Sequence, residues 1–373
     1  MKNKNYNIGL IGCGDIAAQY LDTIKHIPNL NVTAVATRHP SSIEKKARHH
    51  SIPKVCSVNE LLADKNIDII LNLTTPDAHY DLALAALKAG KHVYNEKPLA
   101  FTRDQCKKLL QAADKKNLRI GCAPDTFLGP AIQTSRRIID TNGIGTPLHA
   151  ALFMQSPGVE HWHPNPEFYY KPGGGPLFDM GPYYLTALVY LLGPVKSVFG
   201  SASTNIPQRT ITSKPKYGKK IRVEVPTHVL AVLTLKSGVI CSLAMSFEVR
   251  ASRHSGIEVH GTDATLFIKD PNYFDTAVSI TQGHYDANQQ YIWTAQTLDF
   301  ELPHIQRGFG LAQMTRAMDN KKEHLTNGKL AAHVVDIMQT IHESARHNKP
   351  LPVKSSVTQP PLLDKKLISY LKR

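Results

Sequence analysis

Residues 9–21, GLIGCGDIAAQYL, decide the fold of the first part of the chain. The apolar strand pattern ends in Gly12-x-Gly14-x-x-Ala17, and helical spacing follows at once. A dinucleotide-binding turn needs Gly12 at the tight bend, Gly14 where backbone approaches a pyrophosphate, and a small Ala17 where helix and strand pack closely. The pyrophosphate would lie at the N-terminus of the helix. An ordinary tight β–α turn is the alternative, but the surrounding βαβ unit favours dinucleotide binding.

Strand and helix patterns alternate around this turn as far as residue 123. Residues 67–76, IDIILNLTTP, form a continuous apolar run, which is typical of a strand buried on both faces of a sheet. Strands are expected at 6–12, 31–37, 67–76, 91–98 and 118–124, and helices at 15–27, 40–50, 58–64, 77–90 and 102–117. This alternation predicts an N-terminal Rossmann domain with a doubly wound parallel sheet, of α/β class.

The pattern changes after Pro124. From residue 195 to residue 300, strand patterns follow one another without helices, and residues 205–220 are expected to form an exposed loop. This part predicts an α+β domain with a large open antiparallel sheet, followed by two helices. The predicted domains are residues 1–124 (NAD(P)-binding), 125–305 (substrate binding and oligomerisation) and 306–373 (C-terminal helices near the interdomain cleft).

The net charge, the cysteine content and the lengths of the apolar runs restrict the class of protein. The formal net charge of +14 permits an anionic partner, but the lysines and arginines are spread over many helices, so a phosphorylated cofactor is favoured over nucleic acid. Five scattered cysteines without CxxC spacing indicate reduced thiols. No signal-peptide pattern opens the chain, and no apolar run reaches the roughly 18 residues that span a bilayer. We therefore expect a cytoplasmic protein without nucleic-acid or membrane partners.

The end of the second strand bears on the choice of cofactor. An acid is expected there if the protein binds the ribose 2′-hydroxyl of NAD, but this chain has Thr37 and Arg38. Because a guanidinium binds phosphate in bidentate fashion, NADP is favoured over NAD. The alternative is that Arg38 only stacks on adenine, which either cofactor allows.

Three further segments carry a family resemblance. They are residues 74–93, residues 89–100 with Glu96-Lys97-Pro98, and residues 173–181, GGGPLFDMG. Together with the glycine turn, they resemble the glucose–fructose oxidoreductase / inositol dehydrogenase (Gfo/Idh/MocA) family over roughly residues 6 to 200. The resemblance implies that Lys97 lies beside the nicotinamide and the reacting carbon. The expected cofactor contacts are Gly12, Gly14, Asp15, Ile16, Thr37, Arg38, Thr74, Thr75, Pro76, His79, Glu96 and Lys97.

The same family has the pattern GG-x-x-x-D-x-G-x-H beneath the substrate. Asp179 takes the position of the acid, and Tyr183 stands where the family has histidine, which marks a divergent subgroup. At spacing i and i+4 the two side chains would share one helix face. Lys97, Asp179 and Tyr183 are the expected catalytic residues, with Tyr183 either transferring a proton or orienting Asp179. The alternatives are a solvated Lys97 and an Asp179 that only complements a helix N-terminus.

The loop at residues 157–175 is rich in aromatic and hydroxyl-binding side chains. Such a mixture suits a sugar or polyol, because aromatic faces pack on C–H surfaces while polar groups bind hydroxyls. His161-x-His163 invites a zinc site, but no third ligand follows at a recognisable spacing, so no metal is expected. The glycines at 173–175 are expected to let backbone approach cofactor and substrate. The expected substrate contacts are Asp125, Thr126, Trp162, His163, Tyr169, Asp179 and Tyr183.

These observations predict an NAD(P)-dependent dehydrogenase or reductase that transfers hydride to or from a secondary alcohol or ketone of a sugar, polyol or inositol-like substrate. The alternatives are a glycosidase that uses bound NAD for transient oxidation, and a catalytically silent NAD(P)-binding regulator. A homo-oligomer, dimer or tetramer, is expected through the antiparallel sheet.

Overall fold

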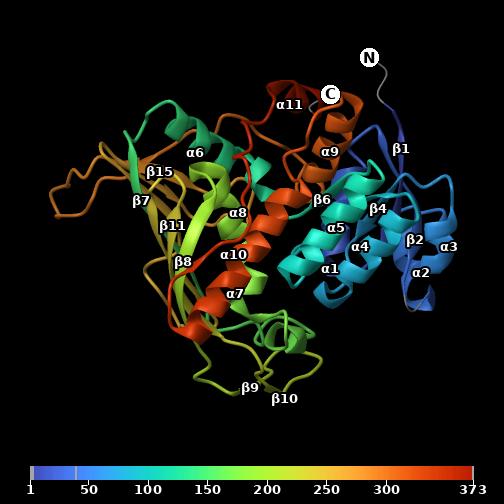
Figure 1. The fold of residues 1–373 in the computed structure, drawn as a ribbon, viewed down its shortest axis with the longest axis horizontal. Coiled ribbons are helices and arrows are strands. Elements are labelled where there is room, and N and C mark those ends of the chain that lie inside the picture. Colours follow the sequence, from blue (N-terminus) through green and yellow to red (C-terminus); the bar gives the residue numbers. More distant parts are fainter. Residues whose placement is uncertain (1–3, 38–39, 372–373) are drawn as a thin grey trace. The chain divides into compact units, whose positions relative to one another are not determined.

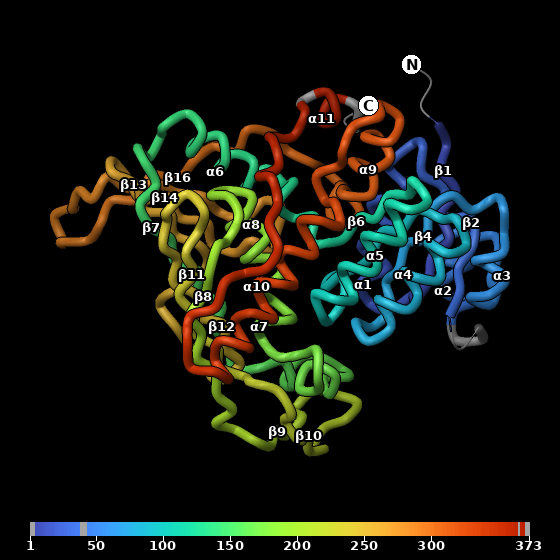
Figure 2. The backbone as a smooth tube through the Cα atoms, in the orientation of Figure 1, coloured from blue at the N-terminus to red at the C-terminus, as the bar shows by residue number. Residues whose placement is uncertain are grey.

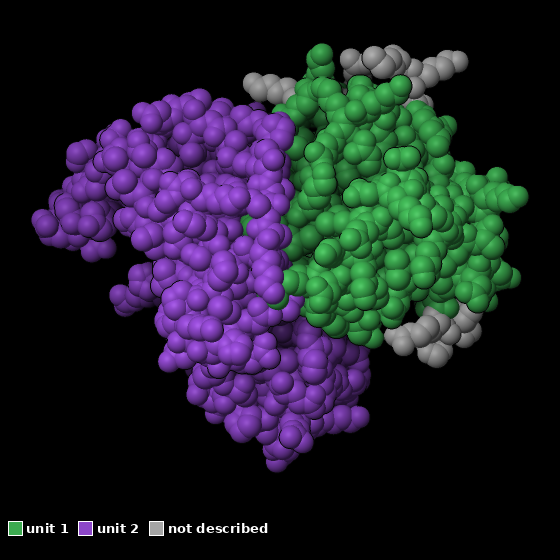
Figure 3. Space-filling model, in the orientation of Figure 1, with its two compact units in different colours: residues 1–129, 301–335, 363–373 green, residues 130–300, 336–362 purple. Residues whose placement is uncertain are grey.

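The structure, a computed structural model, describes residues 4–37 and 40–371 (Figures 1 and 2). The chain divides into two compact units, coloured separately in Figure 3. Unit 1 consists of residues 1–129, 301–335 and 363–373, and unit 2 of residues 130–300 and 336–362. The segment after residue 305 is therefore shared between the two units instead of forming a third one.

Unit 1 contains a six-stranded parallel sheet in the order β3-β2-β1-β4-β5-β6. The strands are β1 (Tyr6–Ile11), β2 (Leu30–Ala36), β3 (Lys54–Cys56), β4 (Ile69–Asn72), β5 (His92–Asn95) and β6 (Ile120–Cys122). The order reverses beside β1, the arrangement in which dinucleotides bind outside the carboxyl ends of the strands. The predicted Rossmann sheet is confirmed, and β3 is an addition to the strands expected from the sequence.

Helices cover this sheet, with α4 and α5 packed against each other (Figure 1). The helices of unit 1 are α1 (Asp15–Ile24), α2 (Pro40–His49), α3 (Val58–Ala63), η1 (Pro76–Ala78), α4 (His79–Lys88), α5 (Arg103–Lys115), η2 (Thr126–Leu128), α9 (Phe309–Asp319) and α11 (Lys365–Leu371). Capping boxes begin two of them: Ser57 with Glu60 opens α3, and Thr102 with Gln105 opens α5. Each box satisfies two backbone N–H groups that would otherwise lack a partner.

Unit 2 contains a nine-stranded sheet in the order β16-β15-β14-β13-β7-β12-β11-β8-β17. Its strands are β7 (Pro147–Gln155), β8 (Val195–Ser203), β11 (His228–Leu235), β12 (Ile240–Ser246), β13 (Gly256–Gly261), β14 (Thr265–Ile268), β15 (Val278–Thr281), β16 (Thr294–Ala295) and β17 (Leu351–Pro352). The sheet is mixed, because β7 and β12 run parallel while the other neighbours are antiparallel. Parallel neighbours need a long crossover, and the chain from β7 to β12 supplies it with two α-helices, one 3-10 helix and four strands.

The helices of unit 2 are α6 (Pro130–Asp140), η3 (Pro166–Tyr170), α7 (Gly175–Asp179) and α8 (Gly181–Leu192), and α10 (Gly328–His347) passes from unit 1 into unit 2. The whole of α8 is buried. The backbone carbonyl of Ile341 in α10 lies so close to Gly200 of β8 that a Cβ there would be 2.7 Å from it. One face of the sheet is thus packed tightly against helix.

The segment expected as an exposed loop, residues 205–220, is partly ordered as a hairpin. Strands β9 (Gln208–Thr210) and β10 (Lys220–Arg222) pair antiparallel, and they lie at the lower end of Figure 1. Arg209, Ile211 and Ile221 are buried, so this segment has a small core of its own. None of the described helices is long and apolar enough to cross a membrane.

Candidate active site

The glycine turn of unit 1 lies where the strand order reverses. Gly12 follows β1 with φ of +85°, and a Cβ on it would lie 2.8 Å from the carbonyl carbon and oxygen of Leu73, which follows β4. Only glycine adopts this conformation without strain and also allows the two loops to approach so closely. The sequence-predicted turn and the loop that begins at Thr74 therefore meet at one edge of the sheet.

The N-terminus of α1 is open. Gly14 is its N-cap residue, no side chain caps the helix, and nothing lies within 4 Å of where a Cβ of Gly14 would be. Free backbone N–H groups at a helix start bind phosphate well, so the turn fits a pyrophosphate. Asp15 and Ile16 form the first turn above it, and the ammonium of Lys46 donates to the carbonyl of Cys13 (3.0 Å). Lys46 adds a positive charge that sequence reasoning missed.

A buried histidine connects two loops of the expected cofactor site. The ring nitrogens of His79 lie 2.7 Å from the carbonyl oxygen of Pro98 and 3.0 Å from that of Thr74. Burial lowers the pKa of His79, so a neutral ring is favoured and one nitrogen donates. The Thr74 hydroxyl is itself fixed, since it donates to Asn72 (2.7 Å). His79 is thus a positioning residue, whereas Thr75 and Pro76 lie at the surface between these anchors.

Glu96 holds the segment that carries Lys97. One oxygen of its carboxylate accepts from the buried Tyr20 hydroxyl (2.8 Å), and the other accepts from the backbone N–H of Lys97 (2.7 Å). Burial raises the pKa of Tyr20, so its phenol remains a donor. Both oxygens of Glu96 therefore accept hydrogen bonds inside the protein, while Lys97 is half-buried just after β5.

The two residues on which the cofactor preference was predicted follow β2. Thr37 is half-buried, and Arg38 lies outside the described residues.

Asp125 is anchored inside unit 1. It is 0% exposed, and one of its oxygens accepts from the backbone N–H groups of Gly308 (2.8 Å) and Gly310 (2.9 Å) at the start of α9. Burial raises its pKa to about 6. These contacts give Asp125 a structural role at a helix N-terminus. The neighbouring Thr126 is buried as well, so the substrate contacts expected for both residues remain predictions from the resemblance.

Unit 2 holds a pocket of about 480 Å³ near the junction of α7 and α8. Asp179, the last residue of α7, lines it, and Trp162 forms an exposed part of its wall. This volume lies within the range of small-molecule sites. The pocket brings together two of the sequence-predicted substrate residues.

The other predicted residues of the loop lie around His163. Its ring packs edge-on against Trp162 (5.3 Å between centroids), Phe168 (5.5 Å) and Tyr169 (5.1 Å). His163 also accepts from the backbone N–H of Asn165 (3.0 Å). His163 and Tyr169 are thus members of an aromatic cluster within the loop, and neither lines the 480 Å³ pocket.

The two adjacent tyrosines of α8 lie in different surroundings, and the helix assignment is interrupted before them. Helix α7 ends at Asp179 and α8 begins at Gly181, because Pro182 has no N–H to bond the carbonyl of Phe178. Met180 between the two helices keeps a right-handed helical backbone conformation, and the helix face expected to be shared by Asp179 and Tyr183 stays a prediction. Tyr184 lines the pocket, whereas Tyr183, 6% exposed, does not.

The glycines before α7 serve the packing of the chain on itself. A Cβ on Gly174 would lie 2.5 Å from the carbonyl oxygen of Tyr169, and one on Gly175 would lie 2.8 Å from that of Pro226. Gly175 also has φ of +82°. Their expected use was approach to ligands, but here the close neighbour is the protein's own backbone.

Sequence reasoning missed several residues of the pocket. Lys269, Asp270 and Tyr273 line it from the segment after β14, and Phe153 lines it from β7. The run KDPNY directly after a strand is a polar signal, but only the sheet order brings it to the end of β7. In residues 4–37 and 40–371, no group of three metal-ligating side chains could hold an ion.

Comparison with known proteins agrees with both units. Residues 6–123 match the family described as "Oxidoreductase family, NAD-binding Rossmann fold", and residues 132–267 match the "GFO/IDH/MocA C-terminal domain". The 1,5-anhydro-D-fructose reductase of Ensifer adhaerens is 28% identical over 69% of this chain and 74% of its own. The levoglucosan dehydrogenase of Pseudarthrobacter phenanthrenivorans is 22% identical over 89% of this chain and 93% of its own.

The fold is also that of a solved levoglucosan dehydrogenase in complex with NADH and levoglucosan. The TM-score is 0.78 at 21% identity, with 94% of this chain and 99% of that chain covered. Since the two family matches together account for more than half of the chain, and the sheet order and glycine turn agree with them, this chain belongs to the GFO/IDH/MocA family of NAD(P)-dependent oxidoreductases.

Proposed function

We propose that this protein is an NAD(P)-dependent dehydrogenase or reductase that acts on a secondary alcohol or ketone of a sugar, polyol or inositol-like substrate. The observation that carries the proposal is the Gly12 turn, which meets the Thr74 loop where the strand order reverses and leaves the N-terminus of α1 open. The relatives named above are reductases or dehydrogenases of sugar compounds, which supports the substrate class.

The residues of the turn fit a dinucleotide. Gly14 presents a helix N-terminus without a side-chain cap, and Lys46 brings a positive charge to the same turn. Both suit a pyrophosphate. When bound, NAD(P) supplies or accepts the hydride. The Thr74–Pro76 loop and Glu96 hold their positions through His79 and Tyr20, so the expected contact surface is rigid before binding.

Lys97, Asp179 and Tyr183 are the proposed catalytic residues. The ammonium of Lys97 lowers the pKa of the substrate hydroxyl and stabilises the negative charge that develops on its oxygen. Asp179 accepts a hydrogen bond from the substrate and keeps the reacting carbon oriented. Tyr183 stands at the family's histidine position and is the proposed proton-transfer group. Support for the three roles comes from the family motif.

We propose NADP as the preferred cofactor. The support is the Thr37-Arg38 sequence in the place of the acid that binds a 2′-hydroxyl, together with the overall positive charge. We also propose a homo-oligomer formed through the nine-stranded sheet, whose exposed face carries apolar side chains.

The test is a screen of polyols and sugars with NADP and NAD at alkaline pH, read by the formation of the reduced cofactor. The wild-type protein should oxidise at least one member, faster with NADP. Lys97→Ala should lower kcat/KM by about 10³-fold, because it removes the group that stabilises the developing alkoxide. Lys329→Ala is the matched control, since Lys329 is an exposed lysine that forms an ion pair with Glu323.

Each outcome bears on a different part of the proposal. If no polyol or sugar is oxidised or, in the reverse direction, no ketone is reduced, the enzymatic function is wrong and a silent NAD(P)-binding regulator is favoured. If Lys97→Ala retains full activity while Lys329→Ala does too, the catalytic assignment is wrong. A higher kcat/KM with NAD than with NADP would overturn the cofactor preference alone.

A further inference from the structure

The pocket of unit 2 is lined by a tyrosine whose hydroxyl makes no hydrogen bond with any of the described residues. Tyr184 is 3% exposed, yet among the described residues none is within hydrogen-bonding distance of its hydroxyl. The hydroxyl of a mostly buried tyrosine usually has a hydrogen-bond partner. Tyr190 illustrates the usual situation six residues later, since its hydroxyl donates to Gln133 (3.0 Å). The Tyr184 hydroxyl, on a side chain that lines the pocket, is therefore available to a partner from outside the chain.

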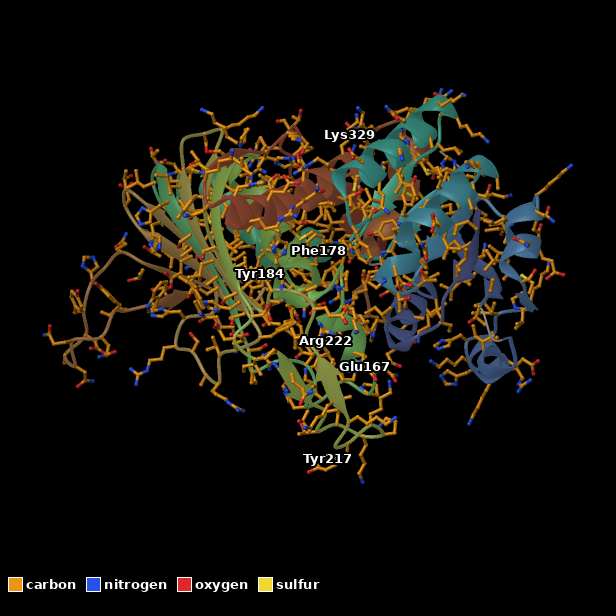
Figure 4. The ribbon with its side chains drawn as sticks, turned by 60° about the horizontal axis from the view of Figure 1, so that its bottom comes forward. Glu167, Phe178, Tyr184, Tyr217, Arg222 and Lys329 are labelled. Carbon is orange, nitrogen blue, oxygen red and sulfur yellow. The ribbon has the colours of Figure 1, made fainter. Side chains whose placement is uncertain are left out.

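The direction of the side chain identifies where that partner would lie. Tyr184 is on α8 beside the strands of unit 2 (Figure 4), and it lines the 480 Å³ pocket together with Asp179. A pocket of this size can take a six-carbon polyol or sugar. Trp162 and Phe153 supply aromatic surface on its wall, on which the C–H groups of such a ligand can pack.

The charged groups that line the pocket restrict the chemistry of the ligand. Asp179 and Asp270 are carboxylates, and Lys269 is the ammonium that lines it with them. Burial, together with the negative charge of Asp270, raises the pKa of Tyr184, so the phenol keeps its proton. Tyr184 is therefore a donor, while ionised carboxylates can only accept. A hydroxyl can satisfy both kinds of group, because it accepts and donates, whereas two carboxylates disfavour an anionic ligand.

We propose that Tyr184 is a substrate-binding residue, which donates a hydrogen bond to a hydroxyl oxygen of a neutral polyol or sugar and selects ligands that carry this hydroxyl. The inference rests on the proposed function for its substrate class, but it assigns a different residue from the tyrosine of the family motif. Tyr184 acts in binding and specificity, and proton transfer is left to other groups.

The first test uses the stability of the protein without substrate. Tyr184→Phe removes only the hydroxyl, and since this hydroxyl has no partner among the described residues, the Tm should stay equal to that of the wild type or rise. Tyr217→Phe is the matched control, because Tyr217 is an exposed tyrosine in the loop between β9 and β10 (Figure 4). A fall in Tm of more than about 1 °C for Tyr184→Phe alone would show a lost internal bond and overturn the inference.

The second test measures ligand binding with the protein saturated with NADPH. The probes are myo-inositol, sorbitol and levoglucosan, titrated by calorimetry. Tyr184→Phe should raise the Kd of the probes that bind by about tenfold, while Tyr217→Phe should leave it unchanged. For a deoxy analogue that lacks the recognised hydroxyl, wild type and Tyr184→Phe should bind equally.

Two results of the binding test would also overturn the inference. One is an equal Kd of the wild type and Tyr184→Phe for every probe that binds. The other is a wild type that binds none of the probes. NADPH affinity, measured in the same samples by fluorescence, distinguishes the failures. If NADPH binds, substrate is turned over and the Kd of Tyr184→Phe for the probes equals that of the wild type, only this inference is refuted. If no member of the whole panel is turned over, the proposed function is refuted.

Discussion

The carboxylate of Asp125 is completely buried, and burial raises its pKa from 3.8 to about 6. The N–H groups of Gly310 and Gly308 and the charge of Arg307 act against this shift, while the charge of Glu96 adds to it. The unfolded chain ionises this carboxyl more readily than the folded one. The contribution of Asp125 to stability is therefore fully present below about pH 4, falls as the pH rises to about 6, and then stays constant.

We expect this term to change the free energy of unfolding by about 3 kcal/mol across that window. The side chain of Asp125→Asn does not ionise, but it keeps an oxygen that can accept hydrogen bonds from the N–H groups of Gly308 and Gly310. The difference in unfolding free energy between wild type and Asp125→Asn should consequently shift by that amount between pH 4 and pH 7, to the disadvantage of the wild type. Urea unfolding at several pH values measures it, and a difference that is independent of pH would contradict the prediction.

At the residue scale, the sequence predicted site residues where they belong to a contiguous motif. Gly12 and Lys97 follow from a strand, a turn and a tripeptide that are contiguous in the chain. Asp270 and Tyr184 do not, because their neighbours come from β7, α7 and the segment after β14, and only the sheet order brings these together. The choice between Tyr183 and Tyr184 also depended on which side of α8 borders the pocket, and the sequence alone does not give this.

At the scale of elements, the two glycines of the β1–α1 turn differ in how far the fold requires glycine. Gly12 has φ of +85° and its Cβ position is 2.8 Å from the backbone of Leu73. Gly12→Ala should lower the free energy of unfolding by about 2 kcal/mol or more, through backbone strain and the displaced loop. Gly14 has φ of −71° and open space at its Cβ position, so Gly14→Ala should change stability by less than about 1 kcal/mol.

The same pair separates folding from binding. Gly14→Ala should raise the Kd of NADPH by about tenfold or more, because the added methyl lies where backbone approaches the pyrophosphate. Thermal unfolding and fluorescence titration of both variants check the contrast. Wild-type affinity in Gly14→Ala would show that the dinucleotide does not bind at this turn.

The elements that escaped prediction have a common physical cause. Strand β3 has three residues, too few for a periodic pattern, and it exists because it pairs with β2 at the sheet edge. Strands β9 and β10 are equally short, and the buried Arg209 at their centre is held by Pro157, Glu160 and Phe247. The helices and longer strands have a hydrophobic pattern that can be recognised in the sequence, whereas β3, β9 and β10 depend on contacts with residues that are distant in the chain.

At the scale of the whole molecule, the sequence predicted two kinds of sheet but not the mixed character of the second. The pattern of β7 and β12 is that of strands in either direction, so their parallel pairing is set by the length of chain between them. Every second residue of β11 is buried in the structure, although its sequence, HVLAVLTL, is almost continuously apolar and shows no such alternation. This alternation of burial is that of a sheet with one covered and one open face.

The open face carries a set of exposed apolar side chains on three neighbouring strands. Phe199 on β8, Leu230 and Val232 on β11 and Ile240 on β12 are 42%, 45%, 47% and 53% exposed in the single chain. Phe199 lies directly beside Val232 in the register. A contiguous apolar patch on an otherwise polar surface is typical of a protein–protein interface, and a second copy of the chain is the proposed occupant.

We therefore expect the wild-type protein to be a dimer or tetramer at micromolar concentration, and Val232→Glu to be a monomer, because a carboxylate in the centre of the interface would be buried without a partner. The folded single chain should tolerate the substitution, since residue 232 is exposed in it, and circular dichroism can verify this. Tyr217→Glu, an equally drastic change at an exposed site in the β9–β10 loop, should leave the mass unchanged. Sedimentation equilibrium distinguishes the outcomes, and a monomeric wild type, or a Val232→Glu variant with the wild-type mass, would rule out this face as the interface.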